Sequence, residues 1–312
     1  MTPTQLRSFA TVVRVGSVRG AASELGVTEA AVSGNVGALR RELDDRLFHP
    51  SKDGLVFTPG GLRLAHRAVE ILGLQDQTVR EVSDAHEGRR MLRVAATSLF
   101  AEYAAPGLIE VFSARANDLE VELFVESATR FNELLMSHGA DVAIGPKASG
   151  PTPFGISSAD SLRYEVVAVA RPDRGDADPL ELPWLLGPSA VDPAGVSQYI
   201  LQRAGVPESR QRIYSSHAAA LDEARDGQGV ALAPSFAVSA AINAGSLVRL
   251  EGPNLSASWT WAMTSLAPDR ASQPAREFIR FASTPRAIQA MLSGSGTDIG
   301  RFKPRVHITL WS

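Results

Sequence analysis

The chain has 312 residues, 44% of them hydrophobic and 21% charged, so it is too long for one simple core and too apolar for a disordered protein. It contains no cysteine, which excludes disulfides, thiolate metal sites and thiol redox chemistry. The formal net charge is −3, although residues 1–66 hold eight Lys and Arg against six Asp and Glu. The excess of basic over acidic residues in 1–66 has the sign that an N-terminal DNA module needs, but it is too small to decide the function.

The first 43 residues read as three short helices. Thr2, Pro3 and Gln5 predict a helix start with a capping box, while Gly16 and Gly26 predict the ends of the first and second helices. The residues expected to face the core are Leu6, Phe9, Ala10 and Val13 in the first helix, Val18, Ala21, Ala22 and Leu25 in the second, and Val32, Val36, Leu39 and Leu43 in the third. Two helices joined by a glycine-containing turn, the second of them longer, are typical of a helix-turn-helix.

A hairpin is predicted after these helices. Pro50 and the pair Asp53-Gly54 indicate a tight turn between two short extended pieces, which would form a wing. The periodicity alone fits a plain three-helix bundle with a hairpin equally well.

A resemblance separates these two interpretations. Residues 9–61 resemble the DNA-binding domain of LysR-type transcriptional regulators along their whole length. The matching residues are Phe9, Gly16-Ser17, Ala21-Ala22, Leu25, Val27-Thr28, Ala31-Val32-Ser33, Leu39, Leu43, Leu47-Phe48, Thr58 and Gly60 or Gly61. The resemblance implies a winged helix-turn-helix at residues 1–58, a linker helix for dimerisation at 59–87 and an effector-binding domain at 88–312.

The third helix departs from the family pattern on the face that would meet DNA. The side chains there are small, and they cannot supply the bidentate arginine contact to guanine. In addition, Glu29-Ala30 stands where the family usually has a Gln-Pro pair. We therefore expect affinity to rest on phosphate contacts and specificity on DNA shape. The predicted DNA-binding residues are Ser17, Arg19, Thr28, Glu29, Ala30, Ser33, Gly34, Arg40, Arg41 and Lys52.

A long helix is predicted from Pro59 to about Ala85. Its apolar seam alternates spacings of three and four, as in a coiled coil, through Leu62, Ala65, Val69, Leu72, Asp76 and Val79. Such a helix could pack on its own domain. The resemblance instead implies that it pairs with a second subunit, and a dimer suits two DNA half-sites.

The remaining chain alternates strands and helices, which predicts a parallel sheet and an α/β fold. Strands are expected at 92–97, 119–125, 141–145, 163–170, 183–187, 211–216, 229–233 and 258–265, with helices between most of them. The order resembles the two-lobed, periplasmic-binding-protein-like effector domain of the LysR family. Lobe I would comprise about 91–162 and 266–294, and lobe II about 171–257, joined by crossings near 163–170 and 258–265. The tail 295–312 has no predicted role.

Ligands of open α/β sheets bind at the carboxyl ends of the strands. The residues predicted there are Thr97, Ser98, Ser127, Thr129, Gly145, His217 and Pro234. Ser98 and Thr129 are expected at helix N-termini, which favour an anion, so a small carboxylate-bearing effector is predicted. Taken singly, Ser98, Thr129 and His217 fit ordinary helix capping equally well.

Rival functions find less support. The chain shows no GxSxG motif, no Ser/His/Asp set, no carboxylate pair and no metal-ligand spacing among its six histidines, so neither an enzyme, a metal site nor a cofactor is predicted. The alternative is a two-lobed binding protein or enzyme whose helix-turn-helix binds DNA weakly or not at all. No secretory signal or stretch of about 18 apolar residues is present, so a cytoplasmic location is expected.

The expected partners are double-stranded DNA, a small effector, a second copy of the chain and, from the resemblance, a tetramer and RNA polymerase. We expect effector binding between the lobes to shift their angle, and thereby the pairing of dimers and the bending of DNA.

Overall fold

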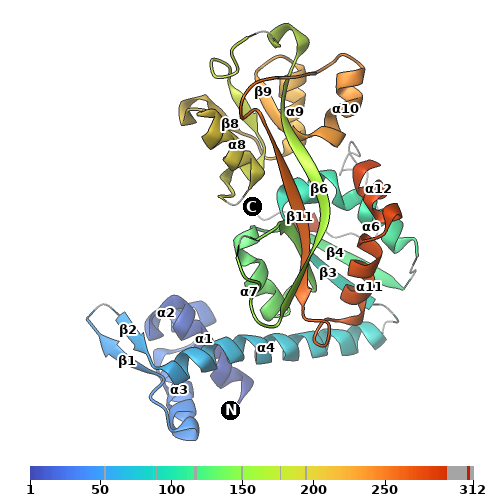
Figure 1. Ribbon diagram of the computed structural model, residues 1–312. Helices are drawn as coiled ribbons and strands as arrows, with labels where there is room; N and C mark the ends of the chain where they lie inside the picture. The colour runs from blue at the N-terminus through green and yellow to red at the C-terminus, as the bar shows by residue number, and fades with distance from the viewer. Residues whose placement is uncertain are drawn as a thin grey trace. The chain divides into compact units, whose positions relative to one another are not determined.

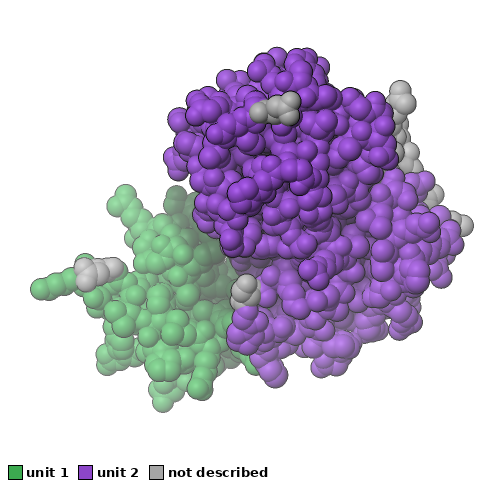
Figure 2. All heavy atoms as spheres, turned by 45° about the horizontal axis from the view of Figure 1, so that its top comes forward, with its two compact units in different colours: residues 1–86, 136–139 green, residues 87–135, 140–312 purple. Residues whose placement is uncertain are grey.

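A computed structural model describes residues 1–293, apart from positions 53, 87, 89, 116–117, 149, 176 and 194, together with residues 308–309. The turn residue Asp53, position 87 at the predicted end of the linker, and residues 295–307 and 310–312 of the tail lie outside the described residues. The chain divides into two compact units, residues 1–86 with 136–139 and residues 87–135 with 140–312 (Figure 2). Each unit is described by itself below.

The first unit holds the three predicted helices and the wing. Its elements are α1 (Pro3–Val15), α2 (Val18–Leu25), α3 (Glu29–Leu43), β1 (Phe48–Ser51), β2 (Gly54–Phe57) and α4 (Pro59–His86). The capping box of Thr2 and Gln5 is present, and Gly16 and Gly26 end their helices in the left-handed conformation at φ +75° and +63°. β1 and β2 pair antiparallel, so the helix-turn-helix and the wing predicted from the sequence are confirmed.

Apolar side chains from all three helices and the wing meet in one core. Phe9 is fully buried and stacks on Phe48 of β1, whose ring also meets Phe57 edge-on. One predicted core position is wrong, since Leu43 is 39% exposed. α3 ends at Leu43 because Asp44 adopts a left-handed conformation, so the last turn extends past the core.

The long helix α4 is continuous, but its predicted seam does not form one exposed stripe. Ala65 is buried in the core of the first unit and Leu72 packs against that core, so this part of the seam serves the helix's own domain. The large apolar side chains that α4 exposes are Leu62, Ile71, Leu74, Val79 and Val82. Leu62 and Val79 of these belong to the predicted seam, whereas Ile71, Leu74 and Val82 lie outside it.

The second unit is built on a mixed sheet flanked by helices (Figure 1). Its elements are β3 (Arg90–Ala96), α5 (Ser98–Tyr103), α6 (Ala105–Ser113), β4 (Leu119–Val125), η1 (Ala128–Arg130), α7 (Phe131–Met136), β5 (Val142–Pro146), β6 (Ile156–Ala170), η2 (Pro172–Arg174), β7 (Trp184–Leu186), η3 (Pro188–Val191), α8 (Val196–Ala204), η4 (Glu208–Arg210), β8 (Gln211–Ile213), α9 (His217–Arg225), β9 (Val230–Pro234), α10 (Ser235–Asn243), β10 (Val248–Arg249), β11 (Ser256–Leu266), α11 (Gln273–Ala282), α12 (Pro285–Ser293) and β12 (Ile308–Thr309).

The strand order β12-β4-β3-β5-β11-β6-β9-β7-β8 divides this sheet into two lobes, with β10 pairing β6. In lobe I, β3 pairs parallel with β4 and β5, and in lobe II β7 pairs parallel with β8 and β9. The antiparallel strands β6 and β11 pass from one lobe into the other side by side (Figure 1). The two-lobed α/β fold and its two crossing strands were both predicted.

Two local expectations change. The helix expected to begin at Ser98 is two helices, since Pro106 has no N–H to donate to the carbonyl four residues earlier. The first crossing strand begins at Ile156 rather than near Arg163.

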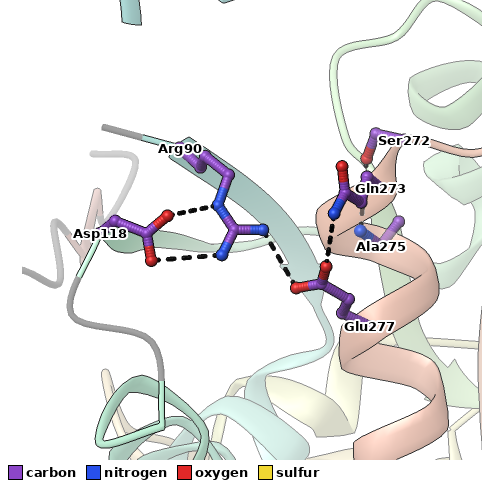
Figure 3. A network of polar contacts seen from close by, with 6 residues as sticks. All are labelled: Arg90, Asp118, Ser272, Gln273, Ala275 and Glu277. Atoms are coloured by element: carbon purple, nitrogen blue, oxygen red, sulfur yellow. Dashed lines mark hydrogen bonds and ion pairs between the residues drawn. The ribbon is translucent and has the colours of Figure 1, made fainter. Parts of the chain in front are cut away.

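An ion-pair network holds the beginning of β3 to its neighbours. Arg90 Nε and Nη2 donate to the two carboxylate oxygens of Asp118, at 2.6 and 3.2 Å, and its Nη1 donates to Glu277 of α11 at 3.1 Å (Figure 3). Gln273 donates to the other oxygen of Glu277. The hydrogen bonds from Arg90 lower the pKa of Asp118.

Membrane-spanning helices and clustered metal ligands are both absent from the part of the chain that the structure describes. Within the described residues, no helix is long and apolar enough to cross a membrane. No group of three or more His, Asp or Glu side chains in the same part of the chain could hold a metal ion.

Candidate functional site

The predicted DNA-reading face of α3 is exposed. Ala30, Ser33 and Gly34 are all open to solvent, and a β-carbon on Gly34 would meet nothing within 4 Å. Thr28 caps α3 by accepting a hydrogen bond from the N–H of Ala31, and Ser17 likewise caps α2. The helix therefore presents a flat backbone with small side chains.

Charged residues frame this face. Arg19 is 90% exposed in its side chain, and its Nε lies 3.8 Å from a carboxylate oxygen of Glu29, itself 59% exposed. Arg41, on α3, and Lys52, in the turn of the wing, are also exposed. The exposed basic groups can reach phosphates, while Glu29 partly offsets Arg19.

Arg40 differs from its neighbour Arg41. Its Nη2 donates to the carbonyl of Phe48 at 3.1 Å, and its guanidinium lies 4.4 Å from the centre of the Phe48 ring. The sequence predicts a phosphate contact for Arg40, but these two interactions tie its side chain to β1. Arg40 therefore holds the wing against α3.

A pocket of about 240 Å³ lies between the two lobes of the second unit. Both lobes and both crossing strands line it, through Thr97, Ser98, Leu99, Val125, Glu126, Ser127, Pro146, Tyr164, Pro188, Ser189, Val191, Asp192, Gly195, Val196 and Trp261. Three of the predicted ligand residues, Thr97, Ser98 and Ser127, are among them.

The other four predicted ligand residues do not line this pocket. Gly145 is buried beside Thr97, since a β-carbon there would come within 2.9 Å of the Thr97 methyl group. Pro234 is buried at the end of β9, and His217 is only 2% exposed. Thr129 is not the helix cap that the sequence suggested, because Ser127 takes that role and accepts from the N–H of Thr129.

His217 instead belongs to a buried chain of hydrogen bonds that ends at the pocket. Its Nδ1 lies 2.8 Å from Glu102 Oε2, and its Nε2 lies 2.8 Å from the hydroxyl of Ser189, which lines the pocket. The Ser189 hydroxyl also lies 2.9 Å from that of Ser197. Burial by itself raises the pKa of Glu102, but hydrogen bonds from His217 and from backbone N–H groups outweigh it and lower that pKa.

The charges of the pocket are acidic. Glu126 and Asp192 are its charged lining residues, and no lysine or arginine is found among the described residues that line it. Glu126 pairs with Arg130, at 2.7 Å, outside the lining. A carboxylate-bearing effector, as predicted, would therefore meet no basic side chain in this lining.

Aromatic rings form the part of the wall that the crossing strands supply. Tyr164 of β6 and Trp261 of β11 stack with ring centres 3.9 Å apart. Trp261 is fully buried, and its Nε1–H has no acceptor within the described part of the chain. Sequence reasoning placed both strands but not these two side chains, nor Ser189 and Asp192 from lobe II. A tryptophan in a predicted crossing strand was the one available signal.

Both units match known families. Residues 3–62 match the family described as "Bacterial regulatory helix-turn-helix protein, lysR family", and residues 85–284 match "LysR substrate binding domain". The chain is 50% identical, over the full length of both proteins, to an uncharacterised HTH-type transcriptional regulator of Mycobacterium tuberculosis.

Solved structures share the fold at lower identity. Full-length LysG of Corynebacterium glutamicum with the bound effector Arg is 20% identical, has a TM-score of 0.54, and aligns over 94% of this chain and 99% of its own. Full-length CbnR complexed with its target DNA is 19% identical, with a TM-score of 0.53, over 90% and 99% of the two chains.

Proposed function

This chain belongs to the LysR family of transcriptional regulators, and from that premise we propose that its first unit reads DNA and that an effector in the pocket between the lobes controls this reading. The observation that carries the proposal is the composition of the pocket wall, to which both lobes contribute. A ligand that contacts both lobes binds one inter-lobe angle more tightly than others, and it can therefore shift the population of angles.

DNA recognition would rest on the backbone and on shape. Small side chains at Ala30, Ser33 and Gly34 let α3 approach the major groove closely, and Ala30 could meet a thymine methyl group. Arg41 and Lys52 would supply phosphate contacts. A solved relative with the same fold is bound to its target DNA, which supports this part of the proposal.

Self-association would use the exposed apolar side chains of α4. Ile71, Leu74, Val79 and Val82 are each at least 43% exposed, and together they are a surface that a second copy of α4 could cover. A dimer would present two copies of α3 to two half-sites, and a tetramer would follow from pairing of dimers. A chain that binds DNA in this way works in the cytoplasm, where RNA polymerase is a further candidate partner.

Fluorescence anisotropy tests the proposal. The purified full-length chain is titrated onto duplex DNA from its own upstream intergenic region and onto a scrambled duplex, across a salt series. We expect tighter binding to the natural duplex and a steep loss of affinity with salt. Equal, weak binding to both duplexes, with and without a screen of small molecules, would contradict it.

One observation raises a second candidate, a hydrolase. Ser189, His217 and Glu102 have the connectivity of a serine–histidine–acid triad. We assign them a structural role, because the hydroxyl of Ser189 also contacts that of Ser197 and Glu102 caps a helix. A fluorophosphonate probe, which labels activated serines, is expected to leave the chain unlabelled. Labelling that disappears in Ser189→Ala would establish the hydrolase instead.

A further inference from the structure

The buried chain of hydrogen bonds reaches from the pocket wall in lobe II to a side chain of lobe I. We propose that Ser189, His217 and Glu102 form a latch between the lobes whose pocket end accepts a hydrogen bond from the ligand, so that the effector is a molecule carrying an ammonium, amide or hydroxyl donor on an apolar body. This inference rests on the proposed function of the pocket, and it names the regulation and the ligand class of that site.

The latch holds because Glu102 of α5 completes the N-terminus of α9. The first N–H groups of a helix have no partner within the helix. In α9, those of His217 and Ala218 donate to the two oxygens of Glu102, at 2.9 and 2.5 Å, while that of Ala219 donates to Ser216. A lobe I carboxylate thus supplies two caps of a lobe II helix, and its charge suits the positive end of the helix dipole. Opening the lobes would strip these donors of their partner.

We take the imidazole of His217 to be neutral, and the direction of each hydrogen bond then follows from the chemistry of the groups. An ionised carboxylate only accepts, so Nδ1 of His217 carries the hydrogen that lies toward Glu102. In the neutral ring, Nε2 then accepts from the hydroxyl of Ser189. The Ser189 hydroxyl has one hydrogen and donates it to His217. The hydrogen bond between the two serines is therefore donated by Ser197. The Ser189 oxygen then keeps one lone pair, which can accept a hydrogen bond from a donor on a ligand in the pocket that this residue lines.

The rest of the lining agrees with a donor ligand. Its charged residues are the acids Glu126 and Asp192, and lysine and arginine are absent from the described lining residues. Val125, Pro146 and Val191 of the same lining are partly or largely exposed and supply its apolar contacts. A ligand acceptor at Ser189, such as a carboxylate, would have to take the hydrogen that now binds His217, and so would weaken the latch.

Calorimetry with two matched probes tests the ligand class. Phenethylamine and 3-phenylpropionate share a ring and a two-carbon chain and differ in the terminal ammonium or carboxylate. We expect the full-length chain to bind the amine more tightly by about tenfold or more. Ser189→Ala should lose most of that preference, whereas the control Ser283→Ala, a surface serine bonded to the carbonyl of Ile279, should keep it. Preference for the acid, as an imidazolium at His217 would produce, or no binding of either probe at about 10 mM overturns the inference.

Spin-label distances test the latch without any ligand. Because the natural chain has no cysteine, Glu110→Cys in lobe I and Glu208→Cys in lobe II, both exposed, place two labels without background. We expect Glu102→Ala to lengthen and broaden the distance distribution, and Glu102→Gln, which keeps the shape, to do so less. The control Glu122→Ala removes a carboxylate paired with Arg93 inside lobe I and should leave the distribution unchanged. An unchanged distribution in both Glu102 variants overturns the latch.

The DNA titration keeps the two proposals apart. If the chain binds its natural duplex specifically but fails both latch tests, the inference is wrong and the regulator stands. If it binds neither duplex specifically while the latch tests succeed, the proposed control of DNA binding is wrong. The latch and the ligand class of the pocket then remain supported.

Discussion

A β-carbon on Gly61 would come within 2.1 Å of the carbonyl oxygen of Leu47. The first turn of α4 therefore lies against the segment that leads into the wing, at a distance that only glycine permits. The same carbonyl accepts a hydrogen bond from the N–H of Thr58, and Leu47 itself holds a left-handed φ of +64°. The wing and the long helix thus share one anchoring point.

The first prediction concerns that anchoring point. Gly61→Ala should destabilise the first unit by about 1–3 kcal/mol, because the methyl group forces backbone apart. Hydrogen exchange of the core amides of α1 and α3 measures the change. The control is Gly37→Ala, a helical glycine of α3 with nothing within 4 Å of its β-carbon. It should stabilise the same unit by about 0.5–1 kcal/mol, and equal destabilisation by both substitutions would contradict the account.

The neighbouring arginines of α3 should respond differently to alanine. Arg41→Ala should weaken binding to natural and scrambled duplexes alike and reduce the salt slope by about 1 for each phosphate that the arginine neutralises. Arg40→Ala should chiefly loosen the wing, since Arg40 is bonded to Phe48. Anisotropy across a salt series, with hydrogen exchange of β1, separates the two effects. An equal reduction of the salt slope in both variants would show that Arg40 also reaches the DNA.

The third prediction is the pH dependence of the network at β3. Hydrogen bonds from Arg90 lower the pKa of Asp118 in the folded chain. A carboxyl group whose pKa is lowered by folding stabilises the fold at pH values above its pKa in the unfolded chain, about 3.9. This stability is lost as the pH falls toward the pKa of the group in the folded chain. Asp118→Asn should therefore lower the melting temperature at neutral pH and flatten its fall in acid.

Melting curves between about pH 7 and pH 3 measure this effect. The matched control is Asp269→Asn, which changes an exposed carboxylate on the same unit. A melting temperature that falls in acid as steeply for Asp118→Asn as for the natural chain would show that this carboxylate is unimportant.

A fourth prediction concerns the glycine beside the latch. A β-carbon on Gly187 would lie 2.4 Å from Cδ2 and 2.5 Å from Cγ of His217. Gly187→Ala should displace the imidazole from Ser189 and Glu102, destabilise the second unit by about 1–3 kcal/mol and lengthen the inter-lobe distance as Glu102→Ala does. The spin-label pair and a melting curve measure both. Loss of stability with an unchanged distance would separate packing at Gly187 from the latch.

Local signals account for how well the first unit could be predicted. The caps Thr2, Gly16 and Gly26 act within one helical turn, so they can be recognised from the neighbouring residues in the sequence. Leu43 was misjudged, and the contacts of Arg40 with the wing were not foreseen, because the surroundings of both residues depend on where the chain goes next. Asp44 stops the helix, and the wing returns to cover Arg40.

The pocket was only half predictable for the same reason. Thr97, Ser98 and Ser127 follow parallel strands of one lobe. They can be predicted because ligands of such sheets bind at the carboxyl ends of the strands. Ser189 comes from the other lobe, and nothing near it in the sequence marks a ligand site. Trp261 was signalled only by its place in a predicted crossing strand. Glu102 reads as an ordinary helical acid until the fold brings it to His217, 115 residues later.

The antiparallel pairing of β6 and β11 makes lobe II one continuous stretch of chain. Val166 lies opposite Ala257, so the segment between them leaves lobe I and returns to it at neighbouring points. A segment whose two ends lie next to each other can be replaced by the corresponding segment of a related protein without changing the path of the rest of the chain. Such an exchange would transplant Ser189, Asp192 and His217 while keeping Thr97, Ser98 and Glu102. Recombination at these two crossing points therefore offers a route by which regulators of this architecture acquire new inducers while retaining their DNA targets.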